Sequence, residues 1–224
     1  MNYRKTKIAP GEIYHIFNRS IAQVPIFLSN RDFLRFTEVI DYYRFLSLPM
    51  RFSHYNRLEA DIKKSFLDEL YQKRETLIEI YSFCLIPDHF HFLLKELKEN
   101  GIRKFISNIQ NSYAKYFNTK TERSGSLFQE MFKAVRIASD EQFIHVARYI
   151  HLNPYSSFLF DNPDRLKTFR WSSFGDYLGI NNHPFISQSF LGSFFKSPTD
   201  LEKFTLDRAE YQRNLEKIKH LILE

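Results

Sequence analysis

The sequence predicts an α+β fold, a ferredoxin-like βαββαβ sandwich with a central antiparallel sheet. The first observation is the order of its segments, which alternate strand-type runs with amphipathic helices as β-α-β-β-α-β-α. The second is a pair of apolar runs, residues 79–86 and 90–97, separated only by Pro87 and Asp88. A following helix and a C-terminal helical extension complete the expected architecture.

The first half of this pattern contains one strand, one helix and a long insertion. Residues 12–19, EIYHIFNR, form the first strand-type run. Ser29 or Asn30 can cap a helix over residues 31–46. Residues 47–58 are loop-like, and residues 60–73 have the periodicity of a second helix. Residues 47–78 are therefore expected to be a helical insertion before the hairpin.

The second half begins with a helix over residues 101–118, whose apolar side chains share one arc. Tyr113 and Tyr116 lie within that arc, so their expected role is packing. Residues 127–137 are strand-like. Ser139 then opens a helix, with Gln142 completing a capping box, and Pro154 is expected to end it.

Two regions are expected along the chain, a core domain at 1–155 and a C-terminal extension at 156–224. The extension includes RWSSFGDYLG at 170–179 and a helix over 201–223. No internal repeat or low-complexity tract is evident.

The composition is that of a globular chain, with 43% hydrophobic and 26% charged residues, and it narrows the function classes. The one cysteine, Cys84, excludes a disulfide framework and a cysteine-based zinc site. We expect a cytoplasmic protein, because there is no signal-peptide pattern at the start and no long apolar span. With six glycines, no phosphate-binding glycine loop occurs, so no nucleotide cofactor is expected.

The net charge of +6 is concentrated in one region. Residues 100–136 contain seven basic residues and only two acidic ones. Such clustering favours a polyanionic partner, although a solvated basic face gives the same pattern.

The candidate site begins with PDHFHF at residues 87–92. Side chains alternate along a strand, so His89 and His91 point to one face while Phe90 and Phe92 point to the other. Their Cβ atoms would be roughly 6.5–7 Å apart, at a rise of ~3.3 Å per residue, so both imidazoles can bind one metal. The alternative is a pair of half-exposed histidines with no ligand.

A second group lies sixty residues later in HVARYIHLNP. On a helical wheel, Tyr149 and Asn153 fall on one flank of the core stripe, and they are one turn apart. A tyrosine beside a metal held by histidines can attack a phosphodiester and form a covalent phosphotyrosine. That intermediate keeps the bond energy, so no ATP is required.

These motifs resemble the HUH single-tyrosine transposases, and most closely the REP-associated tyrosine transposases, a branch linked to repetitive extragenic palindromes in bacterial genomes. The similarity covers about residues 14–180. The ordered segments that carry it, besides PDHFHFLL and RYIHLNP, are YHIFNRS, PIFLSNRDFLRF, SGSLFQEMFKAVRI and RWSSFGDYLG.

The resemblance implies an enzyme, a metal-dependent single-stranded DNA endonuclease and strand transferase that cleaves next to palindromic hairpins. By position, Tyr149 matches the catalytic nucleophile that forms a 5′-phosphotyrosine. His89 and His91 match the metal-binding pair, and Asn153 matches the residue that completes the site. The implied metal is Mg²⁺ or Mn²⁺, whereas two imidazoles alone would suggest zinc. Relatives act as a monomer or homodimer.

Seven polar residues are expected to bind the DNA, because basic and amide side chains contact phosphates. They are Asn18, Arg19, Lys115, Lys120, Arg123, Lys133 and Arg136. The chain departs from the family pattern at Asp88, where many relatives have Asn, and in the length of residues 47–78.

Two other functions are compatible with the residues. A domesticated protein that binds palindromes without cleaving them would keep the same surface. A zinc hydrolase would use His89 and His91, but the sequence has no HExxH-type set of further ligands.

Overall fold

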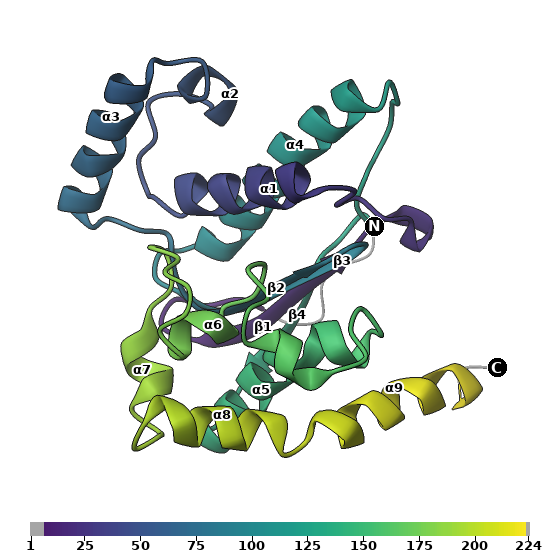
Figure 1. Cartoon of the computed structure of the whole chain (residues 1–224). Helices are drawn as coiled ribbons and strands as arrows, with labels where there is room; N and C mark the ends of the chain where they lie inside the picture. Colours follow the sequence, from purple (N-terminus) through teal and green to yellow (C-terminus); the bar gives the residue numbers. More distant parts are fainter. Residues whose placement is uncertain (1–6, 223–224) are drawn as a thin grey trace.

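A four-stranded antiparallel sheet with the strand order β2-β3-β1-β4 forms the centre of the computed structural model (Figure 1). The structure describes residues 7–222, and their side chains as far as residue 217. The strands are β1 (Ile13–Arg19), β2 (Ile78–Ile86), β3 (His89–Glu96) and β4 (Lys133–Ile137). This order, with a helix between β1 and β2 and another between β3 and β4, confirms the ferredoxin-like prediction.

The β2–β3 hairpin turns at Pro87 and Asp88, as predicted. The carbonyl of Pro87 accepts hydrogen bonds from the backbone N–H groups of Ile26 and Phe27, and that of Asp88 accepts one from Ser20. The tip of the hairpin is therefore held by the segment that leads into α1. These bonds fix the end of the sheet at which His89 lies.

One face of the sheet is covered by two helices, α1 (Asn30–Tyr43) and α4 (Gly101–Lys120) (Figure 1). Their apolar sides pack on alternate strand residues, including Tyr14, Phe90 and Phe92, all fully buried. Tyr113 is also buried in this core, and its hydroxyl donates to the carbonyl of Ile26 at 2.6 Å. The predicted packing role of Tyr113 is confirmed.

The opposite face is covered by α5 (Asp140–Ser156) and by the C-terminal elements (Figure 1). Those elements include α8 (Pro198–Leu206) and α9 (Ala209–Ile222). Shorter pieces between them are η2 (Pro163–Leu166), α6 (Phe174–Tyr177) and α7 (Gln188–Gly192). The sheet is thus enclosed between two helical layers. The division into a core domain at 1–155 and an extension at 156–224 stays a prediction. Residues 1–6 and 223–224 of these two regions lie outside the described part of the chain.

The insertion contains α2 (Phe52–Tyr55) and α3 (Ala60–Lys73) beside α1. The predicted bounds of α3 are confirmed. Most of α3 is exposed, and Leu70 is its buried residue. A 3₁₀ turn, η1 (Ile21–Gln23), follows β1.

Three predicted boundaries were wrong. Of the predicted strand 127–137, only Lys133–Ile137 forms a strand. Residues 127–132 are irregular apart from one isolated bridge between Phe128 and Ser20. The predicted helix 201–223 is two helices, and its last residue lies outside the described part. Helix α5 continues to Ser156 with Pro154 inside its last turn, where the missing N–H costs one intrahelical bond near the end of the helix rather than in its middle.

Ser139 caps α5 as predicted, but the returning bond of Gln142 goes to the residue before the cap rather than to Ser139 itself. Ser139 Oγ accepts the Gln142 N–H at 3.2 Å, and Gln142 Oε1 accepts the Ala138 N–H at 2.7 Å. None of the described helices is long and apolar enough to cross a membrane.

Candidate nuclease site

The two histidines of β3 face α5, and the two phenylalanines beside them face the other core. His89 and His91 are 9% and 4% exposed, so they are buried side chains rather than the half-exposed pair of the alternative reading. Their ring centroids are 5.0 Å apart. Strand alternation therefore brings both imidazoles to one place between the sheet and α5.

His91 is contacted from two sides. Its Nδ1 lies 2.9 Å from His15 Nε2 on the neighbouring strand β1. Its Nε2 lies 3.3 Å from Asn153 Nδ2 on α5. The two nitrogens of His91 therefore have different environments, a strand-borne imidazole on one side and the predicted Asn153 on the other.

Burial lowers the pKa of His15 to about 4, so this imidazole is neutral at neutral pH. A neutral imidazole can accept a proton from its neighbour. The amide nitrogen Nδ2 of Asn153, which can only donate, faces His91 Nε2. We therefore assign Nδ1 as the protonated nitrogen of His91 and the donor to His15, with the lone pair of His91 on Nε2.

His89 is oriented by the residue before it. His89 Nδ1 lies 2.7 Å from Asp88 Oδ1, and Arg19 Nε lies 3.9 Å from the other oxygen of Asp88. Burial raises the pKa of Asp88, but the bond to His89 and the charges of His89 and Arg19 lower it more, so Asp88 is ionised at neutral pH. The ionised carboxylate fixes Nδ1 as the donor of His89 and leaves Nε2 as the ligand nitrogen.

Tyr149 meets these histidines edge-on. Its ring centroid is 5.6 Å from that of His91 and 5.8 Å from that of His15. Asn153, 3% exposed, lies one turn further along α5. The two sequence motifs predicted to form one site, although sixty residues apart, are therefore in contact.

The backbone of α5 at Tyr149 is held by the C-terminal helix. Gln212 Nε2 on α9 donates to the carbonyl of Tyr149 and to Ser156 Oγ, both at 3.1 Å. The extension thus braces the helix that carries Tyr149. Nothing in the sequence pattern of residues 201–223 indicated this contact.

A metal bound here would have two imidazole nitrogens from the protein. With the Asn153 amide turned so that its oxygen rather than its nitrogen faces His91, it would also have one amide oxygen. Among the described residues, no three His, Cys, Asp or Glu side chains are grouped to hold an ion by themselves. The donors nevertheless fit a divalent metal, because each histidine has its Nδ1 occupied by a polar partner. Such partners are usual for histidines that bind metal through Nε2. Remaining positions would be filled by water or phosphate oxygens.

His15 was not singled out from the sequence. It stands in an alternating strand, YHIFN, and the alternation alone places its side chain on one of two faces. The pairing of β1 with β3, in which Phe17 lies opposite His91, decides which face and brings His15 to His91. His15 can therefore be assigned to the site only when the pairing of β1 with β3 is known.

The predicted DNA-binding residues do not form one surface. Lys133 lies near the site, with its Nζ 6.0 Å from the ring of Phe17, which stacks on His91. Lys115 and Lys120 lie on α4, across the sheet from the histidines.

The other four residues predicted to bind DNA make hydrogen bonds or ion pairs within the protein. Asn18 is buried, and its amide bonds Gln129 O and the Arg19 N–H. Arg136 pairs with Glu12 at 2.6 Å, and Arg123 contacts the carbonyl of Ser126. The side chain of Arg19, 40% exposed, is the one beside His89.

His151 lies on α5 between Tyr149 and Asn153 but is not part of the site. Its Nε2 lies 3.0 Å from Ser173 Oγ, and its ring packs on Phe174 and Tyr177. Burial lowers the pKa of His151 to about 3. It is a core histidine.

Comparison with known proteins agrees with the site. Residues 50–153 match a family model described as "Transposase IS200 like", a range that contains His89, His91, Tyr149 and Asn153. No curated protein sequence matches the chain.

Among solved structures, the chain is similar to one described as "Structure of the REP associates tyrosine transposase bound to a REP hairpin". The TM-score is 0.52 and the sequence identity 11%, over 84% of this chain and 93% of that chain. At this identity the likeness shows a shared fold. With the match of residues 50–153 to the IS200-like transposase model, it confirms the resemblance predicted from the motifs.

Proposed function

We propose that this transposase relative is a metal-dependent single-stranded DNA endonuclease and strand transferase that cleaves next to palindromic hairpins. The observation that supports it best is the contact between the two motifs, with Tyr149 edge-on to His91 and Asn153 at 3.3 Å from His91 Nε2. A structural role for Tyr149 alone would not require two buried histidines and an amide beside it.

In the proposed reaction, the phenolic oxygen of Tyr149 attacks the phosphorus of a DNA phosphodiester. The bond between phosphorus and the 3′ oxygen breaks. Tyr149 loses its proton, and the departing oxygen gains one to become a 3′-hydroxyl. The product is a 5′-phosphotyrosine, and attack by another 3′-hydroxyl reverses the step and rejoins the DNA.

His89, His91 and Asn153 would hold Mg²⁺ or Mn²⁺ in this proposal. A divalent ion there supplies charge that polarises the phosphoryl oxygen and stabilises the transition state. His15 and Asp88 orient the two imidazoles through their Nδ1 atoms. Arg19 and Lys133, at the margin of the site, are placed to contact phosphates that flank the cleaved one.

The test uses a hairpin oligonucleotide with a single-stranded flank, incubated with the protein and Mn²⁺. The wild type is expected to give a covalent protein–DNA adduct on a denaturing gel. Tyr149→Phe should give none, whereas Tyr211→Phe, a change at an exposed tyrosine of α9, should give as much as the wild type. An adduct with Tyr149→Phe would show that Tyr149 is not the nucleophile.

The same assay separates the proposal from its rivals. Hairpin binding without any adduct in Mg²⁺, Mn²⁺ or Zn²⁺ would indicate a palindrome-binding protein that does not cleave. Cleavage that needs stoichiometric Zn²⁺ and leaves no protein on the DNA would indicate a hydrolase.

A further inference from the structure

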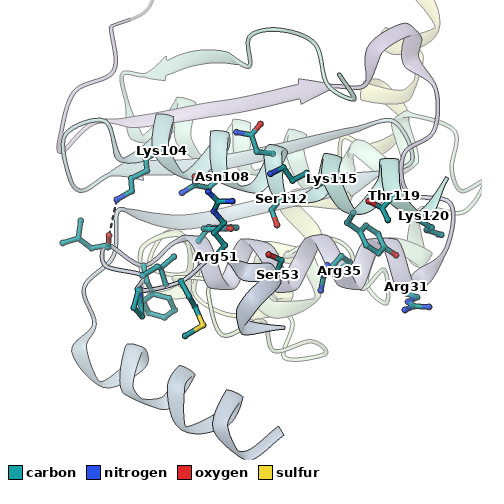
Figure 2. Close-up of a pocket in the computed structure, with 18 residues that line it drawn as sticks. Arg31, Arg35, Arg51, Ser53, Lys104, Asn108, Ser112, Lys115, Thr119 and Lys120 are labelled. Carbon is teal, nitrogen blue, oxygen red and sulfur yellow. Dashed lines mark hydrogen bonds between the residues drawn. The ribbon is translucent and has the colours of Figure 1, made fainter. Parts of the chain in front are cut away.

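A groove of about 820 Å³ lies between α1, α4 and the segment that leads into α2 (Figure 2). It is on the α1/α4 side of the sheet, whereas His89 and His91 face α5 on the other side. The groove is therefore separate from the candidate nuclease site, and the proposed chemistry makes no use of it.

The charge of the groove is of one sign. Six basic residues and no acidic residue line it. One row of side chains on α4, spaced by three or four residues, supplies much of its wall. Figure 2 shows this row facing the basic residues of α1 and Arg51, which precedes α2. The six basic residues are Arg31, Arg35, Arg51, Lys104, Lys115 and Lys120.

Part of this charge is compensated within the protein. Lys120 bonds the buried carboxylate of Asp32 at 2.6 Å, and Arg35 lies 3.8 Å from Glu38. Lys104 contacts the carbonyl of Leu46. For the other three basic side chains of the groove, no carboxylate among the described residues lies within ion-pair distance. These are Arg31, Arg51 and Lys115, all exposed. The groove thus keeps a positive potential available to a ligand.

Part of the groove lining is apolar. Tyr43, Leu46, Leu48 and Met50 line it and are only half-buried. Small polar side chains, including Asn108, Ser112 and Thr119, also line it. A ligand that fills the groove would therefore combine negative charge, hydrogen-bonding groups and an apolar face.

We propose that this groove binds a short unpaired segment of DNA, with phosphates on Arg31, Arg51 and Lys115 and a base against Leu48 and Met50. An unpaired nucleotide exposes both its phosphate and the face of its base. A duplex presents phosphates but hides its base faces in the stack, so it could use only the basic side chains of the groove. Inorganic phosphate would likewise use charge alone.

The inference rests on the proposed function in one respect, that the ligand is DNA. It adds a second contact, away from the scissile phosphate and across the sheet from it. Unpaired nucleotides at the tip, at a mismatch or at the flank of a hairpin could occupy it.

The experiment measures the affinity of the Tyr149→Phe protein, which cannot form the adduct, for fluorescent 12-nucleotide oligothymidylate and for a blunt duplex of equal length. The double variant Arg51→Gln/Lys115→Gln removes two unpaired groove cations. Lys64→Gln/Lys203→Gln removes two exposed cations from α3 and α8 and is the matched control.

The groove variant should bind the oligothymidylate at least about tenfold more weakly. Its plot of log affinity against log salt should be shallower by about 1.4, since each phosphate contact on a single strand contributes roughly 0.7. The control should stay within about twofold of the parent. Leu48→Asn should weaken the same oligonucleotide severalfold and leave the salt slope unchanged.

Several results would overturn the inference. One is that the parent protein does not bind oligothymidylate. Another is that the groove variant and the control lose the same affinity for it. A third is that the groove variant loses as much affinity for the blunt duplex as for the oligothymidylate, which would assign the groove to the duplex backbone. Competition by inorganic phosphate as strong as that by the oligonucleotide would reduce the site to an anion site.

A position-specific readout complements affinity. Photocrosslinking with 5-iodouracil in the oligonucleotide should label peptides from residues 43–53. Labels confined to α5 would contradict the groove assignment. None of these measurements involves cleavage. If the wild type formed no adduct, the proposed function would be rejected and the groove result would still stand. If the groove did not bind the oligonucleotide, the groove proposal would be rejected and the adduct assay would be unaffected.

Discussion

His15 and His91, on neighbouring strands, are joined nitrogen to nitrogen at 2.9 Å. Burial lowers the pKa of His15 to about 4 and keeps the ring neutral, so His15 can accept the hydrogen bond for which His91 Nδ1 is assigned as donor. The bond sets both the tautomer and the angle of the His91 ring, and Nε2 of that ring faces Asn153. His15 is therefore a positioning residue for the proposed metal site.

His15→Leu removes this acceptor, and we expect Mn²⁺ to bind about 10–100-fold more weakly, as for other lost partners of metal-binding histidines. Titration of Mn²⁺ by calorimetry or by its electron paramagnetic resonance signal measures this without any cleavage. His15→Gln, which can still accept a hydrogen bond, should recover part of the affinity. His145→Leu, at an exposed site of α5, is the control. Wild-type affinity in His15→Leu would contradict the positioning role.

Asn153 is expected to offer its amide oxygen to the metal. Asn153→Ala should therefore weaken Mn²⁺ binding, while Asn153→Asp should keep or strengthen it, because carboxylates are better ligands for Mg²⁺ and Mn²⁺. Calorimetric titration of both variants measures the difference. If both variants lost affinity equally, the amide would be packing against His91 rather than acting as a ligand.

Much of this site could be predicted from sequence, because it depends on local periodicity. Strand alternation separates His89 and His91 from Phe90 and Phe92, and a helical wheel places Tyr149 off the core stripe. Both inferences concern residues within a few positions of one another. His15 could not be found in this way, since its place depends on how β1 pairs with β3.

Two errors in the predicted elements have related physical causes. Residues 127–132 contain three large apolar side chains, Leu127, Phe128 and Phe132, because these are buried in the α1/α4 core, although the segment is not a strand. Burial alone produced the strand-like pattern. Similarly, Leu201 and Ala209 are buried two turns apart, so helical periodicity continues across the break between α8 and α9.

The clustered basic residues show a third limit. Lys133 and Lys115 are eighteen positions apart in a basic region of the sequence, yet they lie on opposite sides of the sheet. Net charge predicts a polyanionic partner, but only the fold divides the charge between two surfaces.

Asp32 should be important for stability. Its buried carboxylate accepts hydrogen bonds from the Leu28 N–H, Ser29, Tyr116 and Lys120, and so joins the start of α1 to the end of α4. Asp32→Ala removes all of them and leaves Lys120 without its partner. We expect a loss of about 3 kcal/mol in the free energy of unfolding.

Urea denaturation measures the effect of Asp32→Ala, with the exposed Asp68→Ala as control. If Asp32→Ala lost no more unfolding free energy than the control, the cost of desolvating the buried carboxylate would equal the stabilisation from its hydrogen bonds. The double variant Asp32→Ala/Lys120→Met tests the pair, and should be more stable than Asp32→Ala alone.

His151 predicts a dependence of stability on pH. The pKa of His151 is lowered from 6.5 to about 3 in the folded chain, so the unfolded chain takes up a proton that the folded chain does not. This contribution to stability is fully present above about pH 6.5 and is lost as the pH falls toward 3. At about pH 4.5 the loss should approach 2.5 kcal/mol, at roughly 1.4 kcal/mol per pKa unit.

Denaturant titrations at several pH values measure this slope. His151→Gln, which can still bond Ser173, should flatten the profile between about pH 6.5 and 4.5, at some cost in stability at neutral pH. His145→Gln, at an exposed position of the same helix, should leave the profile as it is. An unchanged slope in His151→Gln would mean that His151 is not the source of the acid lability.

Gln212 links the C-terminal extension to the proposed nucleophile. Its amide donates to the carbonyl of Tyr149 and to Ser156, in the last turns of α5, where Pro154 provides no N–H. Gln212→Ala removes both bonds and should lower stability by about 1 kcal/mol. Because the turn that carries Tyr149 then has more freedom, the rate of adduct formation should fall severalfold while hairpin affinity stays the same. Tyr211→Ala, at the exposed position next to it, should change neither rate nor affinity. Equal rates in Gln212→Ala and the wild type would show that α5 holds Tyr149 without help from α9, and would assign the extension to stability alone.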